Sequence, residues 1–455
     1  MAVSSGKSKS RKSLVIIMII LVAVLLAGAA YLSTLLPIIT GYAAKNMGSA
    51  VFISGRMPDE VDSTDLNFSF IKFTRNKVDY SDSSVTSRFL WGRSRAIDRE
   101  ELGVTLVRKS KEKDLRAVKF PELPPPPYSR DSLQWPMGDQ IPDTITGIDT
   151  DALDIISKKV IVENGYGGNV FAFMVLHRGI PVAESYKPQF SKDTRFLSWS
   201  MAKSVLNAMT GVLVQEDGLD IYAPAGIEEW MNDERKNITL NDLMRMQSGL
   251  EWNEDYGSRS DVNIMLFCRN DMAGYVRSRK AEHPAGTFWS YSSGSSNVVS
   301  YIIREHFGND SLYYTFPHLR LFYRIGITEA VFETDPSGTL IGSSYLYATA
   351  RDYARFALLY QQDGIFNGER ILPEGWVAYT REPVPASNGE YGSLFWLHGT
   401  GEVPSAPEDI FMCVGHDGQR IFIMPSKEMI VVVLGYSPRG TIDFDMLLSD
   451  ILKTL

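Results

Sequence analysis

A stretch of nineteen residues without a charged side chain, Leu14–Leu32, constrains the fold of this chain more than any other feature. As a helix rising about 1.5 Å per residue, the stretch approaches the ~30 Å hydrocarbon core of a bilayer. Four basic residues lie between positions 7 and 12, and no further charge appears until Lys45. Basic residues before an apolar span are typical of the cytoplasmic side. We therefore expect a cytoplasmic basic tail over residues 1–13 and a transmembrane signal anchor over residues 14–39.

A cleaved signal peptide competes with this interpretation. Ala27-Gly28-Ala29 resembles the small-residue site at which signal peptides are cut. The apolar run continues beyond it, from Leu35 to Ile39, which favours an uncleaved anchor. Both alternatives export the rest of the chain. We expect a single-pass protein of a bacterial-type inner (cytoplasmic) membrane whose main domain is periplasmic or otherwise extracytoplasmic.

Composition excludes several classes of partner and cofactor. The chain has 455 residues and a net charge of −8, without a basic block beyond the N-terminal tail, so nucleic-acid binding has little support. Cys268 and Cys413 are too few for a disulfide framework, and their apolar neighbours indicate buried free thiols. The six histidines show no short metal-ligand spacing. We expect no metal, no cofactor and no nucleic-acid partner, and nothing in the sequence indicates an oligomeric state.

The chain divides into three parts after the apolar stretch. Residues 40–120 form an N-terminal extension with short strands predicted at 51–54 and 104–107, and no chemistry-bearing cluster stands out there. Residues 121–142 are a proline-rich connector, which we expect to be stiff and extended. Residues 143–455 form the main domain.

Strands at both ends of the main domain enclose a helical middle. The predicted elements are hairpins of 170–176 with 182–186 and of 421–424 with 429–434, and helices over 200–216, 240–246 and 349–361. Thr349 and Asp352 resemble a capping box at the start of the last helix. This order predicts an α+β fold in which the terminal strands share one antiparallel sheet.

Ser200-Met201-Ala202-Lys203 is the motif that carries the most chemistry. Residues three apart on a helix share one face, with Cβ atoms about 5–6 Å apart. Burial lowers the pKa of a lysine, so that its neutral amine can act as a base. A serine activated in this way attacks a carbonyl carbon and forms an acyl-serine, so the motif predicts a serine hydrolase.

The pattern is short, and two other copies, Ser4–Lys7 and Ser110–Lys113, lie in charge-dense stretches where a lysine stays solvated. Only the copy at Ser200 opens an amphipathic run, with apolar residues at helical spacing up to Gly218. Taken alone, its four residues fit equally well a serine at a helix N-terminus and a solvated lysine.

Two further elements would complete a catalytic site. Tyr291 follows a turn-rich approach over 284–290, and a nearby lysine ammonium can lower the pKa of a tyrosine until its phenolate takes the serine proton. The glycine-flanked turn 415–419 brings backbone N–H groups close to a ligand, and one of these could form an oxyanion hole with the N–H of Ser200. A core tyrosine and a plain tight turn are the respective alternatives.

In order and context, these elements resemble the class C β-lactamase-like serine hydrolases, which include penicillin-binding-protein-type esterases, D-aminopeptidases and 6-aminohexanoate-oligomer hydrolases. The resemblance covers about residues 165–437 and extends to segments without catalytic side chains, 238–250, 348–356 and 368–376. It implies a β-lactamase/transpeptidase-like fold: an antiparallel sheet flanked by helices, plus a mostly helical subdomain.

The resemblance also implies roles for individual residues. Ser200 would be the nucleophile, Lys203 its partner and Tyr291 the general acid/base. The residues that would hold the oxyanion or line the substrate cleft are His416, Asp417, Gly418, Gln419, Ser293, Tyr256 and Trp396. The 6-aminohexanoate-oligomer hydrolases are the most similar group, on the segments 252–256 and 415–419.

Two departures from the β-lactamase pattern bear on the substrate. β-Lactamases of this class usually have asparagine two residues after the tyrosine, where this chain has Ser293. They usually have Lys-Thr-Gly near the C-terminus, where this chain has His416-Asp417-Gly418. The missing lysine would remove a cation that holds a substrate carboxylate.

We therefore expect a serine hydrolase that cleaves a small amide, peptide or ester bond through an acyl-serine. The alternatives are D,D-carboxypeptidase, D-aminopeptidase or β-lactamase activity on cell-wall-type substrates, and a non-catalytic envelope binding module. The expected partners are a small-molecule substrate and, through residues 14–39, a membrane.

Overall fold

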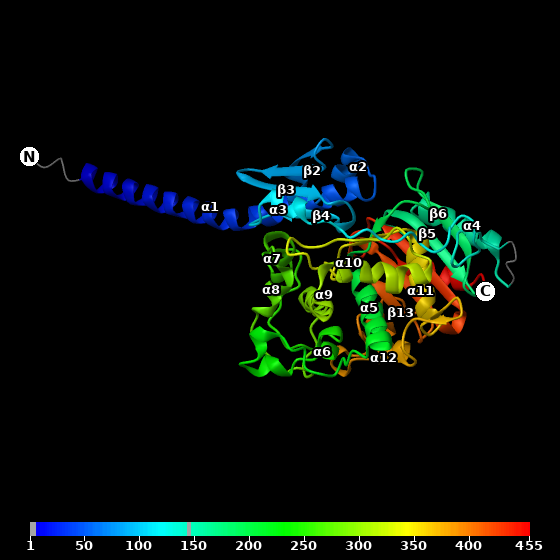
Figure 1. Cartoon of the computed structure of the whole chain (residues 1–455). Coiled ribbons are helices and arrows are strands. Elements are labelled where there is room, and N and C mark those ends of the chain that lie inside the picture. The colour runs from blue at the N-terminus through cyan, green and yellow to red at the C-terminus, as the bar shows by residue number, and fades with distance from the viewer. Residues whose placement is uncertain (1–5, 143–146) are drawn as a thin grey trace, which may run out of the picture.

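The computed structural model describes residues 6–142 and 147–455, with side chains from residue 13 onward. A long N-terminal helix projects from the molecule, a small β-rich extension surrounds its far half, and a larger α+β body follows (Figure 1). The described residues do not include 143–146, which are the first residues of the predicted main domain. They also leave out the basic side chains predicted for the cytoplasmic tail.

Helix α1 (Gly6–Phe52) changes character along its length. Its side chains are largely exposed up to Thr34, and from Leu36 onward they are mostly buried. The part from Ser13 to Phe52 is long and apolar enough to cross a membrane. The strand predicted at 51–54 is wrong, because α1 continues through Phe52 and packs its last turns against the extension.

The extension is built around the buried half of α1. Its four-stranded antiparallel sheet has the order β1 (Arg75–Asp79), β2 (Ser84–Phe89), β3 (Gly92–Asp98) and β4 (Val104–Val107), flanked by α2 (Pro58–Ser63) and α3 (Glu112–Ala117). The predicted strand over 104–107 is confirmed. Gly48 of α1 allows close packing on this sheet, since a Cβ there would lie 2.9 Å from Val104.

A buried ion pair joins α1 to the body. Lys45 forms a short ion pair with Glu333, and both side chains are almost completely buried. Glu333 also accepts hydrogen bonds from the Ser49 hydroxyl (2.9 Å) and the Val104 backbone N–H (2.6 Å). Burial lowers the pKa of Lys45 to about 8, against the opposing influence of Glu333. The extension is thus fastened to the body through one fully satisfied carboxylate.

Replacing one partner of this pair leaves the other charge buried and alone. We expect Lys45→Met to lower the free energy of unfolding by about 3–5 kcal/mol, because breaking a buried pair strands its partner. The double variant Lys45→Met/Glu333→Leu should recover most of that loss. Denaturant unfolding of the detergent-solubilised chain measures both; a double variant no more stable than Lys45→Met would contradict this account.

A six-stranded antiparallel sheet forms the centre of the body. Its order is β12 (Trp396–Leu397), β13 (Phe411–Val414), β14 (Arg420–Met424), β15 (Met429–Gly435), β5 (Val170–His177) and β6 (Ile180–Tyr186). Both predicted hairpins are confirmed, as is the pairing of the terminal strands, in which Val433 lies opposite Phe173.

Helices cover both faces of this sheet, so every residue of β5 is buried. Helices α4 (Thr150–Ile161) and α13 (Phe444–Leu452) pack on one face, and α11 (Ala350–Gln361) packs on the other. The predicted capping box of Thr349 and Asp352 is present at the start of α11.

The remaining elements lie mainly between β6 and α11. The helices are α5 (Ala202–Asp217), α6 (Leu240–Met244), α7 (Asp261–Cys268), α8 (Met272–Arg277), α9 (Ser293–Phe307) and α10 (Asp310–Phe316), and α12 (Trp376–Arg381) follows α11. The short strands are β7 (Phe196–Leu197), β9 (Leu346–Ala348) and β8 (Val331–Phe332), which form one sheet, and the hairpin of β10 (Ile365–Phe366) and β11 (Glu369–Arg370). Helix α5 is buried on all sides over residues 202–213, rather than on the single stripe that its sequence suggests.

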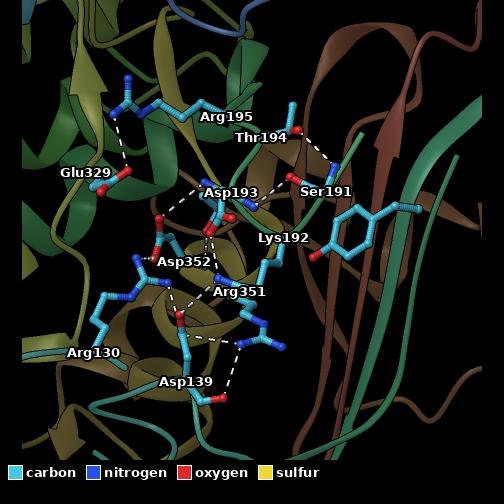
Figure 2. Close-up of polar contacts among 12 residues, drawn as sticks. Arg130, Asp139, Ser191, Lys192, Asp193, Thr194, Arg195, Glu329, Arg351 and Asp352 are labelled. Atoms are coloured by element: carbon cyan, nitrogen blue, oxygen red, sulfur yellow. Dashed lines mark hydrogen bonds and ion pairs between the residues drawn. The ribbon is translucent and has the colours of Figure 1, made fainter. Parts of the chain in front are cut away.

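The proline-rich connector is folded onto the body and is not a free spacer. Arg130 pairs with Asp139 in the connector and with Asp352 of α11, at 3.1 and 3.3 Å (Figure 2). Arg355 of α11 donates back to Asp139 at 2.7 Å. The indole N–H of Trp135 bonds the carbonyl oxygen of Gly179 between β5 and β6. These contacts anchor the chain on α11 just before the sheet begins.

Candidate active site

Ser200 lies in a single 3₁₀ turn, Trp199–Met201, between β7 and the start of α5. Trp199 adopts a left-handed backbone conformation (φ 45°), which is strained for a bulky residue and persists only where the surroundings enforce it. Its ring packs against Tyr345 at 5.7 Å and His416 at 5.4 Å between centroids. Tyr42 of α1 stacks on the same indole at 6.3 Å. The residue that precedes Ser200 is therefore held by aromatic neighbours from three segments.

The Lys203 ammonium group is enclosed by oxygen atoms. Its Nζ lies 2.9 Å from the Ser200 Oγ, 3.0 Å from the Ser293 Oγ and 2.9 Å from the Ser343 carbonyl oxygen. The side chain is only 1% exposed. The structure thus brings together the serine and lysine that the motif predicts to meet.

Burial decides the protonation of this lysine. Removing the amine from water lowers the pKa of Lys203 to about 8, against a smaller opposing effect of the Glu254 carboxylate. A substantial fraction of the amine is therefore neutral slightly above neutral pH. A neutral amine can accept a proton through the 2.9 Å contact with Ser200.

Tyr291 lies beside Lys203 and hydrogen-bonds with Ser200. The ring centroid is 4.9 Å from the Lys203 Nζ and 5.1 Å from the indole of Trp396. Burial raises the pKa of Tyr291, and hydrogen bonds with Ser200 and Trp396 lower it only in part. The expectation of a lowered tyrosine pKa is wrong, because burial and the charge of Glu254 raise it by more than the hydrogen bonds lower it. Tyr291 is a neutral phenol that can donate a proton.

Glu254 is the feature that the motif analysis missed. Its carboxylate accepts the Ser293 hydroxyl at 2.5 Å, the Ser293 backbone N–H at 2.9 Å and the Trp252 indole N–H at 2.5 Å. Ser293 therefore relays a connection from Glu254 to Lys203, at the position where β-lactamases usually have asparagine. Burial raises the pKa of Glu254, and Lys203 opposes that rise. Glu254 lies two residues before Tyr256, inside the segment 252–256 that already resembled the 6-aminohexanoate-oligomer hydrolases. That position was the signal in the sequence that could have identified it.

The remaining predicted residues separate into two groups. His416 stacks on Tyr256 at 5.4 Å, with 16° between the rings, and its ring also contacts the Trp199 indole. Asp417 and Gln419 are buried instead and line a small cavity shared with Asn46 and Arg56 of the extension.

The strand edge predicted over 416–419 is a 3₁₀ turn, His416–Gly418. Both ends of the Gln419 amide bond the backbone of Gly435, at 2.5 and 3.1 Å, so this side chain braces β15 and is not free for a substrate. Burial raises the pKa of Asp417 to about 8, with a further contribution from Asp65.

Glycines bring this turn close to Ser200. A Cβ at Gly415 would lie 2.4 Å from the carbonyl oxygen of Ser198, so only glycine permits the approach. Gly418 has φ 83°, and a Cβ there would lie 2.8 Å from Ser437. The turn therefore lies directly against the segment that leads into Ser200.

Comparison with known proteins agrees with this geometry. The Beta-lactamase family model matches residues 162–443, more than half of the chain. A 6-aminohexanoate-dimer hydrolase of Paenarthrobacter ureafaciens is 24% identical over 299 residues, which are 59% of this chain and 72% of that protein.

Solved structures share the fold. A Bacillus anthracis protein assigned as a 6-aminohexanoate-dimer hydrolase has a TM-score of 0.54 at 24% identity, covering 64% of this chain and 79% of its own. A penicillin-binding protein homolog from Caulobacter crescentus has a TM-score of 0.54 at 14% identity, covering 69% of this chain and 100% of its own. The chain belongs to the Beta-lactamase family and is a serine hydrolase.

Proposed function

We propose that this enzyme cleaves a small amide, peptide or ester bond through an acyl intermediate on Ser200. The observation that carries the proposal is the 2.9 Å contact between the Ser200 Oγ and the amine of Lys203, whose burial lowers its pKa to about 8. An amine that is partly neutral near physiological pH is matched to the task of a general base. Without that contact, the serine hydroxyl would be a weak nucleophile.

The reaction has two halves. Neutral Lys203 accepts the Ser200 proton while the Oγ bonds the substrate carbonyl carbon, and the N–H groups of Ser200 and of the turn 416–419 stabilise the developing oxyanion. Tyr291 donates its proton to the departing amine or alkoxide and is reprotonated from the Lys203 ammonium. Water then attacks the acyl carbon, with the same groups acting in reverse.

We infer that a substrate of the 6-aminohexanoate-oligomer type suits this site better than a β-lactam. His416 stands where β-lactamases usually have the lysine that holds a substrate carboxylate, and it stacks on Tyr256. Trp396 packs beside Tyr291, next to the amine of Lys203. Flat aromatic walls suit the methylene chain of a linear amide. Relatives named for aminohexanoate dimers support the same substrate class.

We further propose that α1 anchors the enzyme in a membrane, with the body outside the cytoplasm. The side chains between Leu14 and Thr34 are exposed and mostly apolar, and the basic residues before them favour a cytoplasmic N-terminus. The helix runs unbroken into the core of the extension, which supports an anchor that is retained. Resistance of the full chain to alkaline extraction from membranes tests this arrangement.

Substrate preference separates the candidate activities. We expect the wild type to hydrolyse linear aminohexanoate dimers and p-nitrophenyl esters, with little turnover of nitrocefin. Ser200→Ala should lower kcat/KM by at least about 10³, because removing the nucleophile of such a unit abolishes covalent catalysis.

Ser258→Ala, at an exposed serine in the loop after Tyr256, is the matched control variant and should leave kcat/KM unchanged. Release of D-alanine from a D-Ala-D-Ala peptide, without cleavage of aminohexanoate dimers, would assign the enzyme to cell-wall peptides. A folded chain that turns over none of these compounds would support the non-catalytic alternative.

The proposed base predicts a pH profile. Below about pH 8 Lys203 is increasingly protonated and cannot accept the Ser200 proton, so kcat/KM should fall about tenfold per pH unit. Above that value the amine is neutral and the rate should level off. The profile is measured on an ester substrate, whose own ionisation does not interfere. A rate independent of pH between 6 and 9 would rule out Lys203 as the base.

Glu254 raises the pH at which this profile rises. Its negative charge raises the pKa of Lys203, so Glu254→Gln should move the rising limb to lower pH. Asp255→Asn changes the charge of the exposed neighbouring residue and should leave the limb in place. An equal shift in both variants would show a general charge effect and not the relay through Ser293.

A further inference from the structure

One end of the extension's sheet carries an exposed apolar surface, which we call the aromatic tip. It comprises the exposed Phe70, Phe73, Leu90 and Trp91 together with the half-buried Phe89. Leu90 and Trp91, in the turn between β2 and β3, are 62% and 59% exposed. The ring of Phe73 stacks on that of Phe89 at 6.3 Å, which joins the segment before β1 to the same end of the sheet. Large side chains gathered in this way mark an interaction surface.

The aromatic tip lies at the level where α1 passes from exposed to buried. The indole N–H of Trp91 donates to the Ser33 hydroxyl at 3.0 Å. A Cβ at Gly92 would lie 2.7 Å from that of Leu36, so the turn touches the helix directly. Figure 1 shows that the ends of strands β2 and β3 lie beside α1, at the point where the helix begins to project from the molecule. The tip therefore continues the apolar surface of the exposed helix.

A row of cations crosses the sheet next to the aromatic tip. The strand register pairs Arg75 with Arg88 and Arg88 with Arg93, so three arginines lie side by side on one face. All three are exposed, and none has an ion pair within the described residues. Like charges directly opposite each other destabilise a sheet. Such a row is stabilised by an anionic partner.

We propose that the aromatic tip and the arginine row dock on the bilayer surface, with the aromatic side chains at headgroup level and the arginines on anionic phospholipid. The proposal rests on the anchoring role of α1. Amphipathic aromatic rings favour the membrane–water interface, and basic residues beside a membrane span are attracted to anionic lipid. The acidic residues Asp79 and Asp82 lie at the opposite end of the sheet, away from the bilayer.

This docking would fix the position of the active site above the membrane. Helix α1 is continuous from Ser33 to Tyr42, nine residues on, and Tyr42 stacks on Trp199. At a rise of 1.5 Å per residue, the contact with Trp199 lies about 14 Å beyond the level of Ser33. With the tip seated, the enzyme could not tilt freely about its anchor, and Ser200 would stay at a set height.

The test uses the full chain in vesicles of phosphatidylcholine with phosphatidylglycerol. A nitrobenzoxadiazole fluorophore is attached at Leu90→Cys in a Cys268→Ser background, while Cys413 is buried and unreactive. The matched control is Tyr80→Cys, which is also exposed but lies in the turn at the opposite end of the sheet. Emission wavelength and collisional quenching by aqueous iodide report whether each probe is in lipid.

We expect the probe at position 90 to shift to shorter wavelength and to be quenched several-fold less than the probe at position 80. Arg88→Gln/Arg93→Gln should reduce this protection, and vesicles of phosphatidylcholine alone should do the same. Equal quenching at both positions, in a chain that resists alkaline extraction, would overturn the docking surface and leave the anchor intact. A chain released by alkaline extraction would overturn the anchor, and the docking surface with it.

Discussion

The structure depends on keeping the amine of Lys203 out of water. Three oxygen atoms, from Ser200, Ser293 and the Ser343 carbonyl, occupy its hydrogen-bonding positions. A buried ammonium would normally need a charged partner, and here Glu254 is held one hydroxyl away. Burial therefore lowers the pKa of Lys203 to about 8, and the charge of Glu254 opposes a larger fall. The surrounding helices must be packed tightly enough to maintain this balance, which explains why α5 is buried on all sides.

The N-terminal helix takes part in the same construction. Tyr42 stacks on Trp199, and Lys45 reaches Glu333 just beyond β8. One rigid element thus runs from the proposed membrane anchor to the residue before Ser200. The strained backbone of Trp199 is enforced partly by a helix that lies outside the region matched by the Beta-lactamase family model. The extension therefore supports the backbone next to Ser200 through Tyr42, a role that its sequence did not suggest.

Local patterns predicted much of this molecule, and long-range packing decided the rest. The two hairpins, the capping box at Thr349 and the meeting of Ser200 with Lys203 followed from periodicity and spacing. The strand expected at 51–54 was wrong because periodicity alone does not distinguish a short apolar strand from the end of a buried helix. The contacts of Glu254 with Ser293 and the raised pKa of Tyr291 depend on which groups surround these side chains in the folded chain, and spacing in the sequence does not give those contacts.

The central claim is that Ser200 carries the acyl group during turnover. Acid quenching during steady-state hydrolysis of a p-nitrophenyl ester, followed by peptide mass spectrometry, measures this directly. We predict the mass of the acyl group on the peptide that contains Ser200, at an occupancy that disappears when Lys203 is replaced by alanine. Turnover without any acylated peptide, or an acyl group on a different residue, would contradict the account.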